Sequence, residues 1–256
     1  TFRYGLLDVG TLSVPLNDIT KAGKYSLIVT VPGTNARNHW NFWVYPKSSP
    51  NHQGDVYIAD TLDNKVRRIL NNGGKVLLLA AGKVSYGKEV VQHFLPVFWN
   101  TSWFKMRPPH TTGLLIDNTH PIFTDFPTEK HSNLQWWELV NKAQVMQFTD
   151  FPSAFQPIVQ SIDTWFVSRK IGMLFEARVG KGRLLMTTMD LSSSLDTRHV
   201  ARQMRHSILR YMQSDAFSPK DEISLQLISD LFTKISGEVN MYTNDSPDEL
   251  KPKLTR

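Results

Sequence analysis

The side chains best suited to chemistry in this sequence are tryptophans, which gather in two short stretches together with amides and histidines. Residues 96–113 read PVFWNTSWFKMRPPHTTG, and residues 130–139 read KHSNLQWWEL. An aromatic ring packs against the C–H face of a sugar while planar polar side chains bind its hydroxyl groups, so this mixture is typical of a carbohydrate pocket. The residues that we expect to face a carbohydrate or a protein interface are Trp99, Trp103, His110, His131, Trp136 and Trp137.

The same tryptophans also have a structural interpretation, because large aromatic side chains commonly anchor cores and domain interfaces. Trp136 and Trp137 are adjacent, so their side chains point in different directions on a helix or a strand. We therefore expect at least one of the two to be structural.

Hydrolysis of a glycosidic bond needs two carboxylates, about 5 Å or about 6.5–9.5 Å apart depending on the mechanism. Several acidic residues lie in predicted loops or near strand ends, but none has a sequence context that singles it out. They are Asp117, Asp125, Glu129, Glu138, Asp150, Asp163, Glu176 and Asp190. A carboxylate in a loop is more often a cap or a surface group, so the sequence assigns no catalytic residue.

Other reaction types find little support in the sequence. Ser85 follows an apolar strand, as in a nucleophile elbow, but Lys83 replaces the first glycine of G-x-S-x-G and no Asp–His partner is evident. The chain has no cysteine, so it has no disulfide, thiolate zinc site or cysteine nucleophile. His199 and His206 are seven residues apart, too far for the i, i+4 zinc pair. We therefore expect neither a metal nor a cofactor.

The composition is that of a globular protein, with 41% hydrophobic and 20% charged residues in a chain of 256. A net charge of +6 raises the possibility of nucleic-acid binding. The basic residues are dispersed, however, and the densest cluster (Arg198, Arg202, Arg205 and Arg210) lies on one predicted helix, where a solvated basic face is the commoner outcome. We expect no nucleic-acid partner. No apolar run reaches the roughly 18 residues that a membrane helix needs, so we expect no membrane span either.

Residues 1–46 have the pattern of the end of a β-sandwich. Apolar and polar residues alternate in KYSLIVTV (24–31) and again over 40–45, and the segment PGTNARN between them predicts a hairpin. An immunoglobulin-like sandwich needs roughly seven strands and about 100 residues. We therefore expect the hairpin to supply the closing strands of a sandwich domain cut from something larger, followed by a linker over 47–53.

From residue 54 the pattern changes to strand, helix, strand. A strand over 55–59 is followed by a helix, capped by Asp60 or Thr61, that runs to about residue 72. The next strand, KVLLLA (75–80), has no polar alternation, which indicates burial on both faces as in a parallel sheet. The sequence therefore predicts an α/β fold, a three-layer domain over 54–217 with a mostly parallel sheet.

The later part of the chain predicts a hairpin and two helices. Glycines at 180 and 182 separate two alternating strands over 171–189, and a helix follows over 197–213. Ser218 and Pro219 predict the start of another helix over 221–234. We expect residues 218–256 to form this C-terminal helix and, after Gly237, a flexible tail.

Five long phrases carry a resemblance to a known family. They are NHWNFWVYP, GDVYIADTLDNKVRRILNNGGKVLLLAAGKV, QHFLPVFWNTSWFKMRPPHTTG, HPIFTDFPTEKHSNLQWWEL and FEARVGKGRLLMTTMDL. Over about residues 24–235 the chain resembles the C-terminal region of bacterial family 2 glycoside hydrolases, the β-galactosidase-like enzymes. This resemblance implies that the α/β domain is similar to the class I glutamine amidotransferase fold, a flavodoxin-like three-layer domain.

The sequence departs from both families at their catalytic residues. The acid/base of the glycosidases follows an asparagine in the barrel, and no Asn-Glu dipeptide occurs here; the amidotransferase nucleophile is a cysteine, which the chain lacks. The resemblance thus implies a non-catalytic part of a glycosidase exported to the periplasm or cell surface.

We therefore expect an accessory region that supports the catalytic barrel, shapes the substrate cleft or mediates oligomerisation. Its expected partners are the remainder of its own polypeptide, a carbohydrate and a second copy of the chain. Two alternatives stay open: a carbohydrate-binding module that uses the Trp-rich loops, and a hydrolase in its own right that acts through Ser85 or Glu176.

Overall fold

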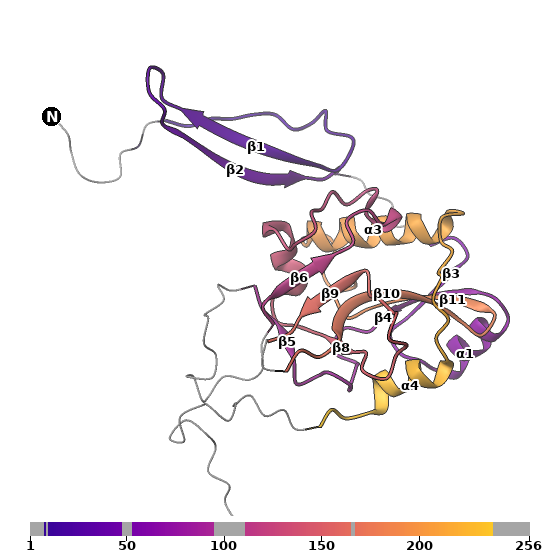
Figure 1. Ribbon diagram of the computed structural model, residues 1–256. Coiled ribbons are helices and arrows are strands. Elements are labelled where there is room, and N and C mark those ends of the chain that lie inside the picture. Colours follow the sequence, from indigo (N-terminus) through magenta and orange to yellow (C-terminus); the bar gives the residue numbers. More distant parts are fainter. Residues whose placement is uncertain (1–7, 9, 48–52, 95–110, 165–166, 238–256) are drawn as a thin grey trace, which may run out of the picture.

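The computed structural model describes residues 8, 10–47, 53–94, 111–164 and 167–237. These residues form an N-terminal β-hairpin and an α/β body (Figure 1). The body is built on a seven-stranded mixed sheet with helices on both faces. The strands of this sheet are β3 (Val56–Ala59), β4 (Lys75–Leu79), β6 (Gly113–Ile116), β8 (Met146–Gln147), β9 (Val159–Ile162), β10 (Ile171–Val179) and β11 (Gly182–Thr187).

The N-terminal hairpin has the two strands that the alternating pattern predicts. β1 (Gly23–Thr30) pairs antiparallel with β2 (Arg37–Val44) over their whole length. The amide of Val31 donates to the carbonyl of Ala36 at 3.1 Å and closes the turn. In Figure 1 this hairpin lies above the body, on the side of the sheet where α3 lies.

The first unit of the body is a parallel strand–helix–strand crossover. α1 (Asn64–Asn71) connects β3 to β4, and β4 pairs in parallel with both β3 and β11. The helix begins later than the sequence suggested, because the carboxylate of Asp63 accepts the amide of Val66 at 2.7 Å and so caps it. β4 is buried on both faces, which explains its continuous apolar sequence.

The rest of the sheet is antiparallel, so the expected mostly parallel sheet is wrong. The strand order is β3-β4-β11-β10-β9-β6, with β8 also paired to β10. β10 runs antiparallel to β11, β9 and β8, and β9 runs antiparallel to β6. The physical reason is the tight turn at Gly180 and Lys181, which reverses the chain; Gly180 has a φ of +61°, a conformation that favours glycine.

Two hydrophobic clusters, one on each face of the sheet, hold the layers together. α3 (His199–Gln213) covers one face with the short helices η2 (Pro121–Phe123), η3 (Leu134–Trp136) and α2 (Trp137–Val140). α1 and α4 (Leu225–Thr233) cover the other face. The hydroxyl of Ser224 accepts the amide of Leu227 at 3.2 Å and caps α4, which begins four residues after the predicted start at 221.

The middle of the chain, which the sequence left irregular, contributes short elements at one edge of the body. β5 (Val91–Gln92) pairs antiparallel with β7 (Ala143–Gln144) in a separate two-stranded sheet. Among the described residues no helix is long and apolar enough to cross a membrane. Together the layers establish an α/β class with a mixed sheet.

Candidate functional site

The most unusual surface of the described structure is one face of the N-terminal hairpin. In an antiparallel pair, directly opposed residues project to the same side, so the register defines each face. Tyr25 opposes Phe42, and Leu27 opposes Trp40. We call the surface formed by Tyr25, Leu27, Val29, Trp40 and Phe42 the apolar hairpin face; all five side chains are exposed.

The opposite face of the hairpin is mainly polar, although Ile28 and Trp43 lie on it, and it turns toward the body at one end. There Lys24 forms an ion pair with Glu129. Farther along, the hydroxyl of Ser26 donates to the side-chain oxygen of Asn41 at 2.6 Å. Lys24 lowers the pKa of the Glu129 carboxyl through this contact, and the side-chain amide of Asn133 lowers it further.

Tyr45, just after β2, fastens the hairpin to the body. Its hydroxyl donates to the side-chain oxygen of Gln135 at 2.8 Å, and its ring stacks on Phe126 with ring centroids 6.3 Å apart. Burial raises the pKa of the Tyr45 hydroxyl, and the negative charge of Glu138 raises it further. Sequence reasoning missed this residue, although its place directly before Pro46 at the end of the last strand was a usable signal.

Physical arguments make the apolar hairpin face the candidate interaction surface. A two-stranded hairpin is at best marginally stable in water without a partner layer. An exposed contiguous apolar patch marks a site of interaction, whereas single exposed apolar residues are ordinary. Both outer edges of the hairpin also lack a strand partner among the described residues. The surface is therefore suited to a partner that covers its face, extends its edges, or does both.

The candidates for sugar recognition fall into three groups. Trp99, Trp103 and His110 lie outside the described residues. His131 is exposed, and its Nε2 lies 3.7 Å from a carboxylate oxygen of Glu129. Trp137 is 52% exposed and so is available to a ligand or partner.

Trp136 lies in the core, so the expectation that it faces a ligand or an interface does not hold. Its ring packs edge-on against Phe123 and Phe126, and its indole N–H donates to the hydroxyl of Thr128 at 2.8 Å. Trp136 ends η3 and Trp137 begins α2. As expected for adjacent residues, the two rings point in different directions.

The acidic residues considered for glycosidase chemistry are each engaged in the fold. Six contact a basic side chain, one is bonded to a neighbouring threonine, and one accepts a tyrosine hydroxyl. The contacts are Asp125–Arg210, Glu129–Lys24, Glu138–Arg198, Asp150–Lys234, Asp163–Arg169, Asp190–Arg198, Asp117–Thr119 and Glu176–Tyr211. A glycosidase acid needs a raised pKa, and the shifts resolved at Glu129 and Asp190 are both downward.

Glu176 lies in a compact contact between the sheet, α3 and the loop before η2. The hydroxyl of Tyr211 donates to one oxygen of Glu176 at 2.7 Å, while the Nε2 of His120 lies 3.7 Å from the other. The Nδ1 of His120 accepts the amide of Ile122 at 3.2 Å and caps η2. Burial raises the pKa of the Tyr211 hydroxyl, and its bond to Glu176 adds to that shift. These contacts tie three elements together.

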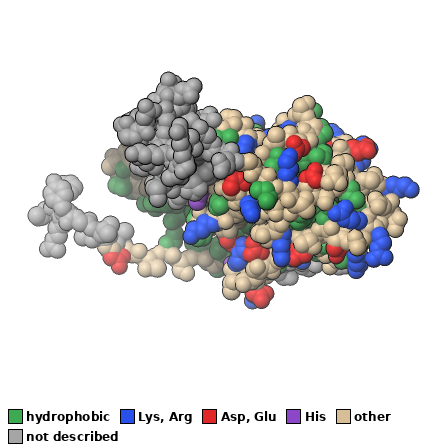
Figure 2. Space-filling view, turned by 90° about the horizontal axis from the view of Figure 1, so that it is seen from below, with side chains coloured by type: hydrophobic (Ala, Val, Ile, Leu, Met, Phe, Trp, Pro, Cys, Tyr) green, Lys and Arg blue, Asp and Glu red, His purple; other side chains and the backbone are tan. Residues whose placement is uncertain are grey.

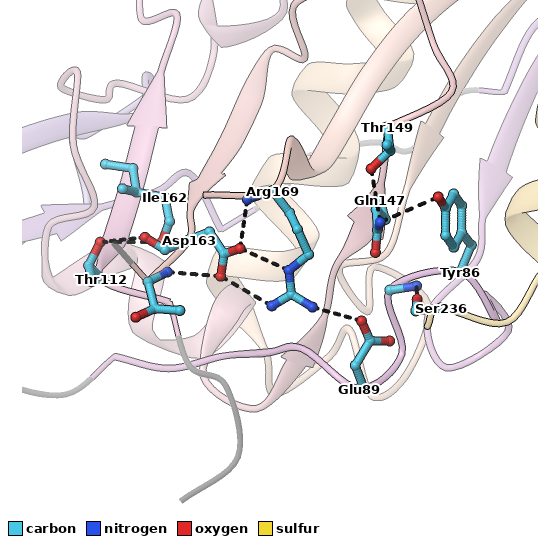
Figure 3. Close-up of polar contacts among 11 residues, drawn as sticks. Tyr86, Glu89, Thr112, Gln147, Thr149, Ile162, Asp163, Arg169 and Ser236 are labelled. Atoms are coloured by element: carbon cyan, nitrogen blue, oxygen red, sulfur yellow. Dashed lines mark hydrogen bonds and ion pairs between the residues drawn. The ribbon is translucent and has the colours of Figure 1, made fainter. Parts of the chain in front are cut away.

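Figure 3 shows the most deeply buried ion pair of the described structure. Arg169 donates from Nε to Asp163 at 2.8 Å and from a terminal nitrogen to Glu89 at 2.9 Å. Asp163 also accepts the amides of Thr164 and Arg169, each at 2.8 Å. Next to it, the hydroxyl of Thr112 donates to the carbonyl of Ile162 at 3.3 Å, so the start of β6 and the end of β9 are joined.

Three of the four clustered arginines make local contacts, among them Arg205, which donates to the carbonyl of Leu191 at 3.0 Å. Arg198 bridges Glu138 and Asp190, and Arg210 pairs with Asp125. Figure 2 shows the molecule from the opposite side to α3, and over that face basic and acidic side chains are interspersed.

Ser85 has no described partner of the kind that a serine nucleophile needs. Within the described residues its hydroxyl has no hydrogen bond to a histidine or a carboxylate, while its amide donates to the carbonyl of Leu231 at 2.9 Å. The described residues also contain no group of three or more histidines and carboxylates that could hold a metal ion.

Comparison with known proteins places the α/β body in a family. A family described as Domain of unknown function (DUF8487) matches residues 57–233, which is more than half of the chain, so the chain belongs to this family. A second family, Domain of unknown function (DUF8488), matches residues 3–46, the stretch that contains the hairpin. No curated protein matches the chain.

Proposed function

We propose that this chain is a non-catalytic accessory region of a β-galactosidase-like family 2 glycoside hydrolase, and that its apolar hairpin face docks against another part of the same polypeptide. The five long phrases that resemble the C-terminal region of those enzymes support the class. The proposal includes a periplasmic or extracellular location and a body related to the class I glutamine amidotransferase fold. The α/β layers and the parallel unit β3–α1–β4 are compatible with that relationship.

The observation that carries the proposal is the exposed apolar hairpin face. Burying apolar surface stabilises a protein or complex by roughly 25 cal/mol per Å². Covering the five exposed apolar side chains would therefore favour association with a partner substantially. In a β-sandwich, such a face packs on the inner face of a second sheet about 10 Å away. A sheet of the same polypeptide is therefore the partner whose shape and chemistry fit best.

The engagement of the acidic residues supports a non-catalytic role. Glu176, which the hydrolase alternative would use, accepts the hydroxyl of Tyr211. Among the described residues, the hydroxyl of Ser85 has no histidine or carboxylate partner. Turnover of nitrophenyl glycosides and nitrophenyl esters by the purified chain decides this point. We expect none above background. Turnover that Glu176→Gln or Ser85→Ala abolishes would favour the hydrolase instead.

A carbohydrate-binding module is the second candidate, and the half-exposed ring of Trp137 beside the exposed side chain of Leu134 favours it. Calorimetric titration of the chain with galactosides and oligosaccharides tests it. Binding that Trp137→Ala or Trp103→Ala abolishes would support a module, whereas the accessory role predicts no heat that depends on either ring.

The experiment that tests the accessory role is to read the gene in frame upstream of the codon for Thr1. We expect a catalytic barrel with paired glutamates, including an acid/base that follows an asparagine. An upstream frame that ends without such a barrel would contradict the proposal.

A further inference from the structure

A groove of about 330 Å³ opens where β6 ends and β9 begins. Its floor is apolar and includes Ile116 and Pro157, which are both buried, while polar side chains form its walls. Pockets for small molecules span about 300–1,000 Å³, so this groove is at the small end of that range.

Backbone hydrogen bonds fix the segments that build the groove. The amide of Ile116 donates to the carbonyl of Lys130 at 2.8 Å, and the amide of Asp117 donates to the carbonyl of Ile158 at 3.0 Å. Gln160, on β9, pairs across the sheet with Leu115 on β6 and with Gly172 on β10. The segments beside the end of β6 and the start of β9 are thus tied to the sheet by backbone hydrogen bonds.

Four polar side chains of the groove have no partner of their own. Among the described residues, the side chains of Asn118, Lys130, Gln156 and Gln160 form no hydrogen bond or ion pair. The side-chain oxygen of Asn118 is also buried, and a buried acceptor without a donor costs about 1–3 kcal/mol.

The chemistry of the walls selects among ligand classes. Three amides offer both donors and acceptors, and Lys130 adds donors, which suits a molecule with several hydroxyl groups. A phosphate is disfavoured because the groove contains the carboxylate of Asp117 and no arginine. A divalent cation is disfavoured because that single carboxylate already accepts the hydroxyl of Thr119 at 2.6 Å.

We propose that this groove binds a neutral polyhydroxylated small molecule of monosaccharide size, with Asn118, Gln156, Gln160 and Lys130 as its hydrogen-bonding residues. The inference goes beyond the accessory role and does not rest on it, because no residue of the apolar hairpin face lines the groove. It also differs from the surface-tryptophan alternative, because Trp137 is not among its lining residues.

Chemical-shift titration of the ¹⁵N-labelled full chain with galactose, glucose and their methyl glycosides tests the groove. We expect shifts confined to residues around 115–119, 130 and 156–160, and a Kd that rises at least about tenfold in the Gln156→Ala/Gln160→Ala variant. Gln226→Ala is the matched control: Gln226 lies on α4 and bonds Asp230 outside the groove, so binding should be unchanged. Thermal melting verifies that each variant is folded.

Three results would overturn this proposal. They are the absence of shifts at millimolar sugar, equal affinity in the double variant and the wild type, and loss of binding in Trp137→Ala alone. None of these results bears on what the upstream reading frame encodes. The proposal of a sugar-binding groove and the proposal of an accessory role can therefore be refuted independently.

Discussion

At the scale of single residues, the ion pairs of the fold differ widely in burial. The pair between Asp163 and Arg169 is nearly closed to solvent, whereas Arg178 and Glu222 form a pair in which both side chains are more than half exposed. Removing one partner of a buried pair leaves an uncompensated charge, which is far more costly than losing an exposed pair. The two pairs therefore differ in energetic importance although both count as salt bridges.

Arg169→Met should lower the free energy of unfolding by about 3–5 kcal/mol, because the buried carboxylate of Asp163 is then left without its cation. Arg178→Met is the matched control and should change it by less than about 1 kcal/mol. Urea denaturation of both variants measures the difference. Equal effects would show that the Asp163–Arg169 pair is not important for stability.

Asp190 should make stability depend on pH. Burial alone would raise its pKa, but the amides of Ser193 and Ser192 and the charge of Arg198 outweigh burial and hold the pKa below its ordinary value. A depressed folded-state pKa stabilises the protein above the unfolded value, and this contribution is lost as the pH falls through the folded value. The wild type should therefore exceed Asp190→Asn in stability at pH 7 and lose that advantage below about pH 4. A difference in the free energy of unfolding between the two proteins that stays constant with pH would contradict this role of Asp190.

At the scale of elements, local patterns located both hairpins, the β3–α1–β4 unit, α3 and α4, but not the short strands and helices between residues 91 and 147. The hairpin of β10 and β11 follows from its glycines, and that hairpin already excludes a mostly parallel sheet beyond β11. α1 and α4 begin later than the sequence predicted, because Asp63 and Ser224 cap them. Equally suitable capping residues lie a few positions earlier in both cases. Choosing among adjacent caps requires the packing of the helix, which the local sequence does not contain.

Gly182 shows how closely the elements approach. A Cβ placed there would lie 2.7 Å from both the Cα and the carbonyl oxygen of Leu70, at the end of α1. Gly182→Ala should therefore lower the free energy of unfolding by about 1–3 kcal/mol, because backbone must move to accommodate the methyl group. Gly237→Ala is the control, since a Cβ there meets nothing within 4 Å. Denaturant unfolding compares the two, and a neutral Gly182→Ala would refute the close approach.

At the scale of the whole molecule, the hairpin and the body differ in how they use their apolar residues. The body buries them in two clusters on the two faces of its sheet. The hairpin leaves one face in water and is fastened to the body through Tyr45 and Lys24. Alternation in the sequence predicted strands with one apolar side, and the structure shows that this side is exposed while the opposite side turns toward the body.

The sequence indicated less of the candidate sites than of the fold. The Trp-rich stretches suggested sugar contacts, yet Trp136 is a core residue because η3 places it between Phe123 and Phe126. The groove at β6 and β9 combines residues 115–119, 130 and 156–160, which become neighbours only when those strands pair. No local pattern marks such a set.

The most direct test of the docking role compares two adjacent residues of β1 in the intact polypeptide. Val29 and Ile28 are equally exposed in this chain, at 49% and 48%, but only Val29 belongs to the apolar hairpin face. The measurement is hydrogen–deuterium exchange of residues 23–44. It is made on the longer polypeptide that the reading frame containing Thr1 encodes. We predict fast exchange in Val29→Asp, where a buried charge would expel the partner sheet, and protection in both Ile28→Asp and the wild type. Equal exchange in all three would contradict docking through this face.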